Sequence, residues 1–434
     1  MGGVRRRVLA AVAAMATVLG ASGCADSADG AGSGRITLKV RLFGTFGYQE
    51  AGLFEKYMAD HPGIRIEYST IQDSGQYWTA LQTSLSTETG LGDVQGIEVG
   101  QVTDATDNMA DSFVDLAQFG ATELKDQFYP WKWAQGLTPD GKVLGLGTDI
   151  GPEAMCYRRD LFAKAGLPTS RADVAALWKN GWDGYVAAGE RFKAAGLPDS
   201  SWTDTASGMF NAMIGQSPDQ YYDASGRLIY DRNPAVAKAW AEAMKIATSG
   251  LSARLTQFTP TWNQAFTTGR FATVACPSWM IGYIKSQTGS LDNRWDVTTV
   301  PGGTGNWGGS YLAVPRASKH QREAADLVIW LTSAQQQVAV FEKTGNFPSN
   351  RIAAAEPAVR DFSDTYFGDV ADPAPIGRIF GDAAGRLPAA VLGARDQVVK
   401  DLITKGGVTR VEAQGQDPAK SWAKVVRDVT AATG

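Results

Sequence analysis

The stretch from residue 271 to residue 315 constrains the fold most, because short apolar runs alternate there with loops that begin at a proline. Proline cannot donate a hydrogen bond to a neighbouring strand, so Pro277 and Pro301 are expected to end the first two runs. The apolar and β-branched runs cover residues 271–275, 297–300 and 311–314. We therefore expect three strands joined by two aromatic loops.

Trp279 and Trp307 lie in these two expected loops. A pyranose ring has an apolar face with hydroxyl groups around its rim, and a flat aromatic side chain on a rigid loop binds such a face by stacking. One buried aromatic contact contributes about 2 kcal/mol. The alternative is that either tryptophan belongs to a hydrophobic core, where large aromatic residues are also common. The glycines on both sides of Trp307 favour the binding interpretation for that residue.

The motifs of this part of the chain occur in the order CPSWM, NWGGSYLAV, a Ser-Lys pair and EAADLVIWL. In this order they resemble the carbohydrate-binding lipoproteins of bacterial ABC importers, the family 1 solute-binding proteins that are similar to maltose-binding protein. The resemblance extends over most of the mature chain. It implies an α/β fold of the periplasmic-binding-protein type, in which a hinge joins two α/β lobes and the ligand cleft lies between them. It also implies a monomeric binding protein rather than an enzyme, with an oligosaccharide ligand, ABC permease subunits as partners and no cofactor.

Chain length and this resemblance together predict the domain organisation. A mature chain of about 400 residues is too long for one ordinary core, which favours two domains. The glycines at 145, 147 and 151 suit a hinge, because glycine absorbs large changes of φ and ψ. We expect lobe 1 to comprise residues 35–147 and 312–345, and lobe 2 to comprise residues 148–311 and 346–434.

Residues 1–23 have the pattern of a secretion signal. Arginines at positions 5–7 precede an apolar run over residues 8–19, which is too short to span a bilayer but suits a signal peptide. Small residues then lead to Cys24, as in a lipoprotein processing site, although Ala21 stands where the family usually has leucine. The alternative is an ordinary signal peptide with an incidental cysteine.

Residues 24–34 are small and polar, which predicts a flexible tether. A lipid on Cys24 would therefore hold the folded part of the chain at the extracytoplasmic face of the cell membrane.

The composition argues against several other classes of protein. Removing the expected signal takes away three arginines and changes the formal charge from -4 to -7, and the remaining chain has no basic run, so nucleic acid is a poor candidate ligand. The two histidines, His61 and His320, are far apart in sequence and have no spacing typical of metal ligands. The scarcity of histidine also argues against a serine-hydrolase triad.

Two cysteines, Cys156 and Cys276, remain after Cys24. An even pair of cysteines in an exported chain predicts a disulfide bond. Both lie in apolar runs that are expected to be strands. The alternative is a pair of buried free thiols.

Three candidate ligand-binding residues follow expected strands in the first part of the chain. Phe46 and Tyr48 come after an alternating strand over residues 35–43, and Gln101 comes after a strand over residues 93–99. Ligands of open α/β sheets bind at the carboxyl ends of the strands. The resemblance also makes the Phe46 loop a sugar-contacting loop. The alternative for Gln101 is an exposed loop amide.

Asp149 and Trp202 complete the candidate ligand-binding residues. Asp149 lies among the hinge glycines, and its carboxylate is able to accept hydrogen bonds from two neighbouring sugar hydroxyls, although a turn-forming role is the alternative. Trp202 lies in a stretch that resembles a family loop with an aromatic residue at the sugar.

Two rival functions stay open at this point. A secreted carbohydrate-active enzyme needs two carboxylates about 5 to 10 Å apart, which Asp149 and Asp204 in principle supply. A binding protein for a peptide or a polyamine is the other rival. A polyamine site would need several acidic residues among the aromatic ones, whereas these loops offer one carboxylate at a time.

Overall fold

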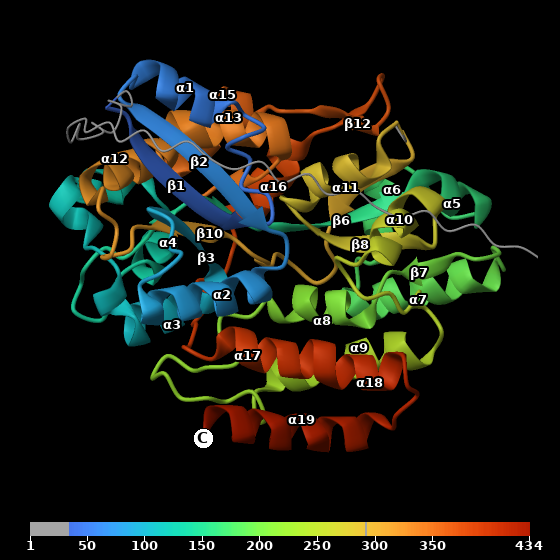
Figure 1. Cartoon of the computed structure of the whole chain (residues 1–434). Coiled ribbons are helices and arrows are strands. Elements are labelled where there is room, and N and C mark those ends of the chain that lie inside the picture. The colour runs from blue at the N-terminus through green and yellow to red at the C-terminus, as the bar shows by residue number, and fades with distance from the viewer. Residues whose placement is uncertain (1–33, 291–292) are drawn as a thin grey trace, which may run out of the picture. The chain divides into compact units, whose positions relative to one another are not determined.

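The computed structural model describes residues 34–290 and 293–434. The expected signal sequence, the lipidation site at Cys24 and nearly all of the expected tether lie outside the described residues. Residues 36–434 form one compact unit with two main sheets that are covered by helices (Figure 1). The predicted α/β fold with two lobes is confirmed.

Lobe 1 is built on a five-stranded sheet with the order β2-β1-β3-β10-β4. β1 pairs in parallel with β2 and β3, whereas β10 is antiparallel to β3 and β4. The predicted βαβ unit is confirmed as β1, α1 and β2, because the apolar side chains of β1 alternate with polar ones and are buried. The strands of this sheet are β1 (Ile36–Phe43), β2 (Ile64–Ile71), β3 (Val94–Glu98), β4 (Leu146–Gly147) and β10 (Ser310–Ala313).

Lobe 2 is built on a four-stranded sheet with the order β7-β8-β6-β9. β6 is antiparallel to both β8 and β9, and β7 is parallel to β8. Every residue of β6 and β8 is buried, which explains the apolar runs at residues 154–157 and 271–275. The strands are β6 (Glu153–Arg158), β7 (Ser201–Thr203), β8 (Phe271–Pro277) and β9 (Trp295–Thr299).

The expected loop between β8 and β9 is wrong in one respect, because it contains a helix, α11 (Met280–Thr288). Met280, Ile281 and Ile284 have helical spacing and are buried. Trp279 is the residue that precedes this helix. The three runs predicted as strands are confirmed as β8, β9 and β10, but β10 belongs to the sheet of lobe 1.

Three stretches of chain pass between the two sheets and form the hinge. The first contains β5 (Asp149–Ile150) between β4 and β6, and the second connects β9 to β10. The third contains β11 (Phe347–Pro348), which pairs antiparallel with β5. The residue numbers at which the sequence analysis divides the two lobes stay predictions.

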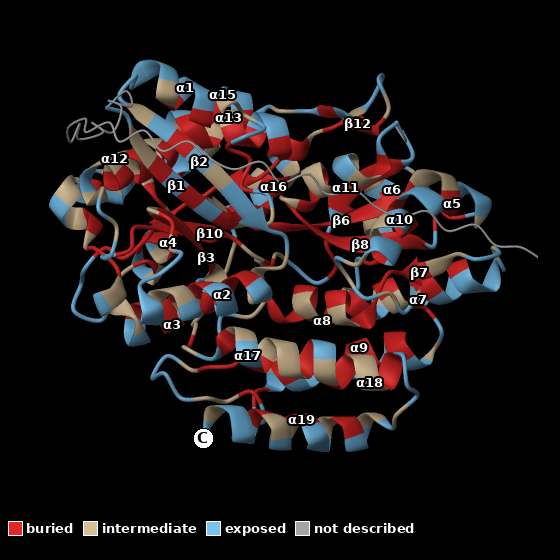
Figure 2. Ribbon diagram, in the orientation of Figure 1, coloured by how far each residue is buried: buried red, intermediate tan, exposed pale blue. Residues whose placement is uncertain are grey.

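Helices cover both sheets, and Figure 2 shows that the buried faces of the helices are turned toward the sheets. Around lobe 1 these are α1 (Leu53–Asp60), α2 (Ser74–Thr87), α3 (Val99–Asn108), α4 (Pro130–Gln135) and α12 (Gln321–Leu331), with 3-10 turns at Ala110–Ser112, Leu116–Phe119 and Ala121–Gln127. Around lobe 2 they are α5 (Arg159–Lys164), α6 (Arg171–Leu177), α7 (Trp182–Ala194), α8 (Ala206–Ile214), α9 (Pro234–Thr248), α10 (Pro260–Thr268) and α11.

The C-terminal part of the chain completes lobe 2. α13 (Ala334–Thr344) contributes Val340 to the core of lobe 1 and Phe341 to a core of lobe 2. The elements that follow are α14 (Arg351–Ala355), α15 (Pro357–Arg360), β12 (Asp364–Gly368), β13 (Pro373–Ala374), α16 (Ile376–Ala384), α17 (Asp396–Asp401), α18 (Thr409–Glu412) and α19 (Pro418–Thr433). A π-helical stretch, Leu402–Val408, joins α17 to α18 and packs against α8 and α9.

Cys156 and Cys276 are joined by a disulfide bond, as predicted. They lie on β6 and β8, which are neighbouring antiparallel strands, with Ala154 opposite Cys276 and Cys156 opposite Val274. Both sulfurs are buried in the apolar core that also contains Trp262 and Trp295. The bond therefore ties the two central strands of lobe 2 together.

We expect the double variant Cys156→Ala/Cys276→Ala to lose about 4 kcal/mol of unfolding free energy. The bond spans a sequence separation of 120 residues, so its removal gives the unfolded chain more conformational entropy. Urea titration measures the loss, and wild-type protein in reductant is the matched control. An unchanged midpoint and slope would contradict this account.

Candidate functional site

A cavity lies between the two lobes and, with its mouth included, encloses about 600 Å³. Lobe 1 contributes α4 and the start of α3, lobe 2 contributes the end of α8 and the loop before β10, and the C-terminal stretch from residue 388 to residue 400 forms the remaining wall. Side chains in these walls include Trp131, Gln135, Tyr221, Trp307, Asp396 and Lys400.

Trp307 is held rigidly in the wall of the cavity. Its backbone N–H donates to the carbonyl of Gly151 at 2.9 Å, and its own carbonyl accepts from Nε1 of Trp279 at 2.8 Å. The two indole rings meet edge to face at 5.9 Å between centroids. Gly308 follows at φ 97°, a left-handed conformation that favours glycine. Trp307 is 9% exposed and belongs to the apolar core of lobe 2 as well as to the cavity wall, so its role in ligand binding stays a prediction.

The contacts of Trp279 differ from those predicted for a ligand-binding residue. Its ring does not line the cavity, and its Nε1 is already used by the Trp307 carbonyl. Trp279 therefore holds Trp307 in place through this hydrogen bond and the edge-to-face ring contact.

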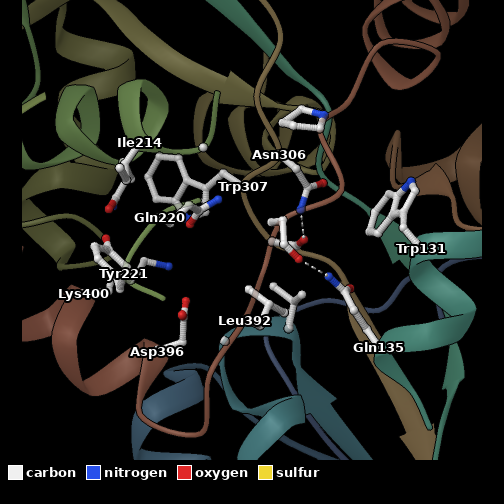
Figure 3. A pocket seen from close by; sticks show the side chains of 17 residues that line it. Trp131, Gln135, Ile214, Gln220, Tyr221, Asn306, Trp307, Leu392, Asp396 and Lys400 are labelled. Atoms are coloured by element: carbon white, nitrogen blue, oxygen red, sulfur yellow. Dashed lines mark hydrogen bonds between the residues drawn. The ribbon is translucent and has the colours of Figure 1, made fainter. Parts of the chain in front are cut away.

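A polar cluster forms one end of the cavity, where Tyr221, Gln220, Lys400 and Asp396 lie on the same side as Trp307 (Figure 3). Burial raises the pKa of Asp396 to about 7, although the N–H of Gly393 and the charge of Lys400 act in the opposite direction. The hydroxyl of Tyr221 is buried and has no hydrogen-bond partner. These groups are able to bind the hydroxyls of a polar ligand.

Trp131 and Gln135 lie at the other side of the same view (Figure 3). Both belong to α4 of lobe 1, and Pro130 at the first position of this helix fixes its start. Gln135 is oriented by Tyr311, whose hydroxyl donates to its Oε1 at 2.9 Å. The cavity therefore has one aromatic platform from each lobe.

Asp149 lies in the hinge and does not line the cavity. Its carboxylate accepts from the Thr148 hydroxyl at 2.7 Å and from the backbone N–H of Ser310 at 2.9 Å. Burial raises its pKa, and the nearby Lys132 opposes this shift. The predicted ligand-binding role does not fit these contacts, because the carboxylate joins two of the chain crossings instead.

Lys132 is a buried cation beside the hinge. Its Nζ lies 3.7 Å from the centroid of the Tyr311 ring, which is a cation–π contact. Burial lowers its pKa to about 7, and the charges of Asp149 and Glu98 act in the opposite direction.

The structure places Phe46, Tyr48 and Gln101 inside lobe 1 rather than in the cavity. Phe46 and Tyr48 are buried in the core of that lobe, where Phe46 packs edge-on against Phe43. Gln101 is 3% exposed in the first turn of α3, and its Nε2 donates to the Ser74 carbonyl at 3.4 Å. The sequence located the correct strand ends, but these side chains turn inward.

Trp202 is also a core residue, because its ring packs among Phe162, Trp178 and Tyr185. It is 1% exposed, so a stacked sugar has no access to it.

Asp204, the second carboxylate of the enzyme alternative, is fully buried in lobe 2 and does not line the cavity. It accepts from Nε1 of Trp262 at 2.9 Å and from Nε2 of Gln257 at 2.9 Å. Asp149 and Asp204 therefore do not face a common cavity.

Sequence reasoning missed Trp131, Gln135, Tyr221, Asp396 and Lys400. The aromatic run YPWKW around Trp131 is a signal of the kind that identified Trp307. The other four give no such signal, because they reach the cavity only through the packing of distant elements.

Among residues 34–290 and 293–434, no group of three or more histidine, cysteine or acidic side chains has the arrangement of a metal site. Within the same ranges, no helix combines the length and the apolar character needed to cross a membrane.

Comparisons with known proteins agree with this geometry. A solved structure described as an extracellular solute-binding protein of family 1 is 39% identical, with a TM-score of 0.78, and the match covers 92% of this chain and all of that one. The arabinooligosaccharide-binding protein of Bacillus subtilis (strain 168) is 24% identical over 337 residues, which is 73% of each chain. The lactose-binding protein of Rhizobium radiobacter is 28% identical over 200 residues, covering 44% of this chain and 46% of that protein.

The family model described as "Bacterial extracellular solute-binding protein" matches residues 52–364, which is more than half of the chain. On this match and on the 39% identical structure that it spans almost completely, the chain belongs to the bacterial extracellular solute-binding proteins.

Proposed function

We propose that this protein is the substrate-binding component of an ABC sugar importer, which captures an oligosaccharide between its lobes and delivers it to a membrane permease. The observation that carries the proposal is that Trp131 of lobe 1 and Trp307 of lobe 2 line one cavity together with unpaired polar groups. Aromatic platforms with polar groups around them match the two surfaces of a sugar ring.

The named relatives support a sugar ligand. Two of the curated relatives are named for arabinooligosaccharide and lactose binding, and neither name describes an enzyme. The rival enzymatic function loses its pair of candidate carboxylates, because Asp204 is buried away from the cavity.

The mechanism is a population shift between open and closed arrangements of the lobes. A ligand that contacts Trp131 and Trp307 at once does so only when the lobes are closed, so it stabilises the closed state by its differential affinity. The closed form then presents the loaded protein to the permease.

We expect sugars to raise the thermal unfolding midpoint of the purified protein in a panel of mono- and oligosaccharides, with peptides and polyamines as controls. Trp307→Ala should weaken the affinity for the best sugar about 30-fold, which corresponds to about 2 kcal/mol of lost aromatic contact. Titration calorimetry measures the affinity, and sugar analysis after long incubation tests for cleavage.

Trp330→Ala is the matched control for this experiment, because Trp330 is a partly buried tryptophan on α12 that packs against Tyr57 and does not line the cavity. It should leave the affinity unchanged. Midpoints that respond to no sugar would refute the proposed ligand class. Cleavage of the sugar would show that the protein is an enzyme.

The buried acid of the cavity should give a recognisable pH dependence. The pKa of Asp396 is about 7 in the folded protein against an ordinary value of 3.8, so the folded state holds a proton that the unfolded state releases. Its contribution to stability is therefore present below about pH 4 and is lost as the pH rises through about 7. Relative to Asp396→Asn, wild-type protein should lose up to about 1.4 kcal/mol per pH unit between these values.

Urea titrations of both proteins at several pH values measure this difference. Asp382→Asn, a change at an exposed position of α16, is the control and should run parallel to wild type. A constant difference between wild type and Asp396→Asn across the pH range would show that Asp396 is ionised throughout.

We also propose that Cys24 carries the lipid that anchors the protein at the extracytoplasmic face of the membrane. Cys24→Ser should move the protein from the membrane fraction to the soluble fraction and abolish incorporation of labelled fatty acid. Ser27→Ala, a change in the expected tether, should leave both readouts unchanged. Membrane retention of Cys24→Ser would refute the anchor.

A further inference from the structure

An irregular stretch of chain, residues 387–395, forms part of the cavity wall between α16 and α17. We call it the cleft segment. Pro388, Ala390 and Leu392 of this segment line the cavity. Figure 3 shows Leu392 between the side of the cavity with Trp307 and the side with Gln135. The segment therefore lies where a long ligand would have to pass.

The cleft segment is attached to lobe 2 through its backbone. The N–H of Val391 donates to the carbonyl of Pro218 at 2.9 Å, and Val391 forms a β-bridge with Asp219. The side chain of Val391 packs against the core that contains Trp307.

The segment is attached to lobe 1 as well. Nε2 of Gln135 donates to the carbonyl of Ala390 at 3.4 Å. Leu392 packs against the lobe 1 core that contains Ile97 and Tyr311. Because both lobes hold the segment, it closes the cleft on this side.

The end of the cavity beyond the segment is also closed. α17 packs against α3, and a β-carbon placed on Gly100 would lie 2.6 Å from Oε1 of Gln397, so the two helices approach closely. Tyr221 and Asp396 at this end are 1% and 5% exposed. A ligand cannot continue past these side chains.

The exposure of the two aromatic platforms also increases away from the closed end. Trp307 beside the closed end is buried, whereas Trp131 on the other side is only partly buried. Two platforms provide stacking surface for two sugar rings. Since Trp131 is the more exposed of the two, a third ring that extended past it would meet more solvent and add fewer contacts.

We propose that the site takes a saccharide end-on and that its recognition is complete at two sugar units. This inference rests on the proposed sugar-binding function and specifies its ligand as disaccharide-sized. The closed end selects a terminal ring, and the cleft segment prevents the chain from running through the cleft.

Calorimetric titration of the purified protein with arabino-, galacto- and malto-oligosaccharides of one to four units tests the inference. In the series that binds, we expect the disaccharide to bind about tenfold or more tightly than the monosaccharide, and the tri- and tetrasaccharide to bind within about threefold of the disaccharide or more weakly. A tenfold or larger gain from two to four units would overturn the inference and leave the sugar-binding function intact. Binding of no member of any series would instead overturn the sugar-binding function.

The double variant Gln135→Ala/Leu392→Ala detaches the cleft segment from lobe 1. Its affinity for the tetrasaccharide, divided by its affinity for the disaccharide, should rise about tenfold because the cleft opens for further rings. Thr304→Ala is the control, since the Thr304 hydroxyl donates to the Arg386 carbonyl at 3.0 Å, just before the segment, and this variant should keep the wild-type ratio. A folded double variant with an unchanged ratio would overturn the role of the segment.

Discussion

The hydrogen bonds at the chain crossings determine where the candidate site lies. Asp149, on the first crossing, pairs with Pro348 on the third, and its carboxylate accepts from the N–H of Ser310, where the second crossing enters β10. Two residues further along, the Gly151 carbonyl accepts from the Trp307 N–H, and the Gly151 N–H donates to Oδ1 of Asn306. The same bonds that hold the crossings together therefore place the Trp307 platform at the cleft.

The charge at the crossings is buried, and the Nζ of Lys132 has no hydrogen-bond partner there. Lys132 lies in the field of Asp149 and Glu98 and over the ring of Tyr311. Removing such charges from water costs several kcal/mol, and the attraction between Lys132 and the two carboxylates recovers part of that cost. We infer that this cluster contributes a defined geometry at the hinge more than it contributes stability.

Much of the fold was predictable from local patterns, and the candidate site was predictable only in part. Alternation of apolar and polar residues identified β1, and the continuous apolar run at 271–275 identified β8, because burial on one or both faces leaves those patterns directly in the sequence. Trp307 was found because glycines flank it. Trp202 and Trp307 both belong to the apolar core of lobe 2, yet only Trp307 also lines the cavity, because tertiary neighbours rather than adjacent residues decide what an aromatic ring covers. Asp396 and Lys400 reach the cavity only because the C-terminal helices return to lobe 2 and contact α3, a long-range arrangement that leaves no local signal.

The polar end of the cavity explains why closure should depend on a ligand. The Tyr221 hydroxyl and the Asn211 Oδ1 line the cavity without a hydrogen-bond partner, and each buried unpaired group costs about 1–3 kcal/mol. Asp396 adds the cost of a carboxyl group whose pKa burial raises to about 7. Opening the lobes returns these groups to water and relieves the cost, so the closed arrangement is disfavoured by its own polar lining. Sugar hydroxyls supply the missing partners, which makes the free energy of closure depend on the ligand rather than on contacts between the lobes.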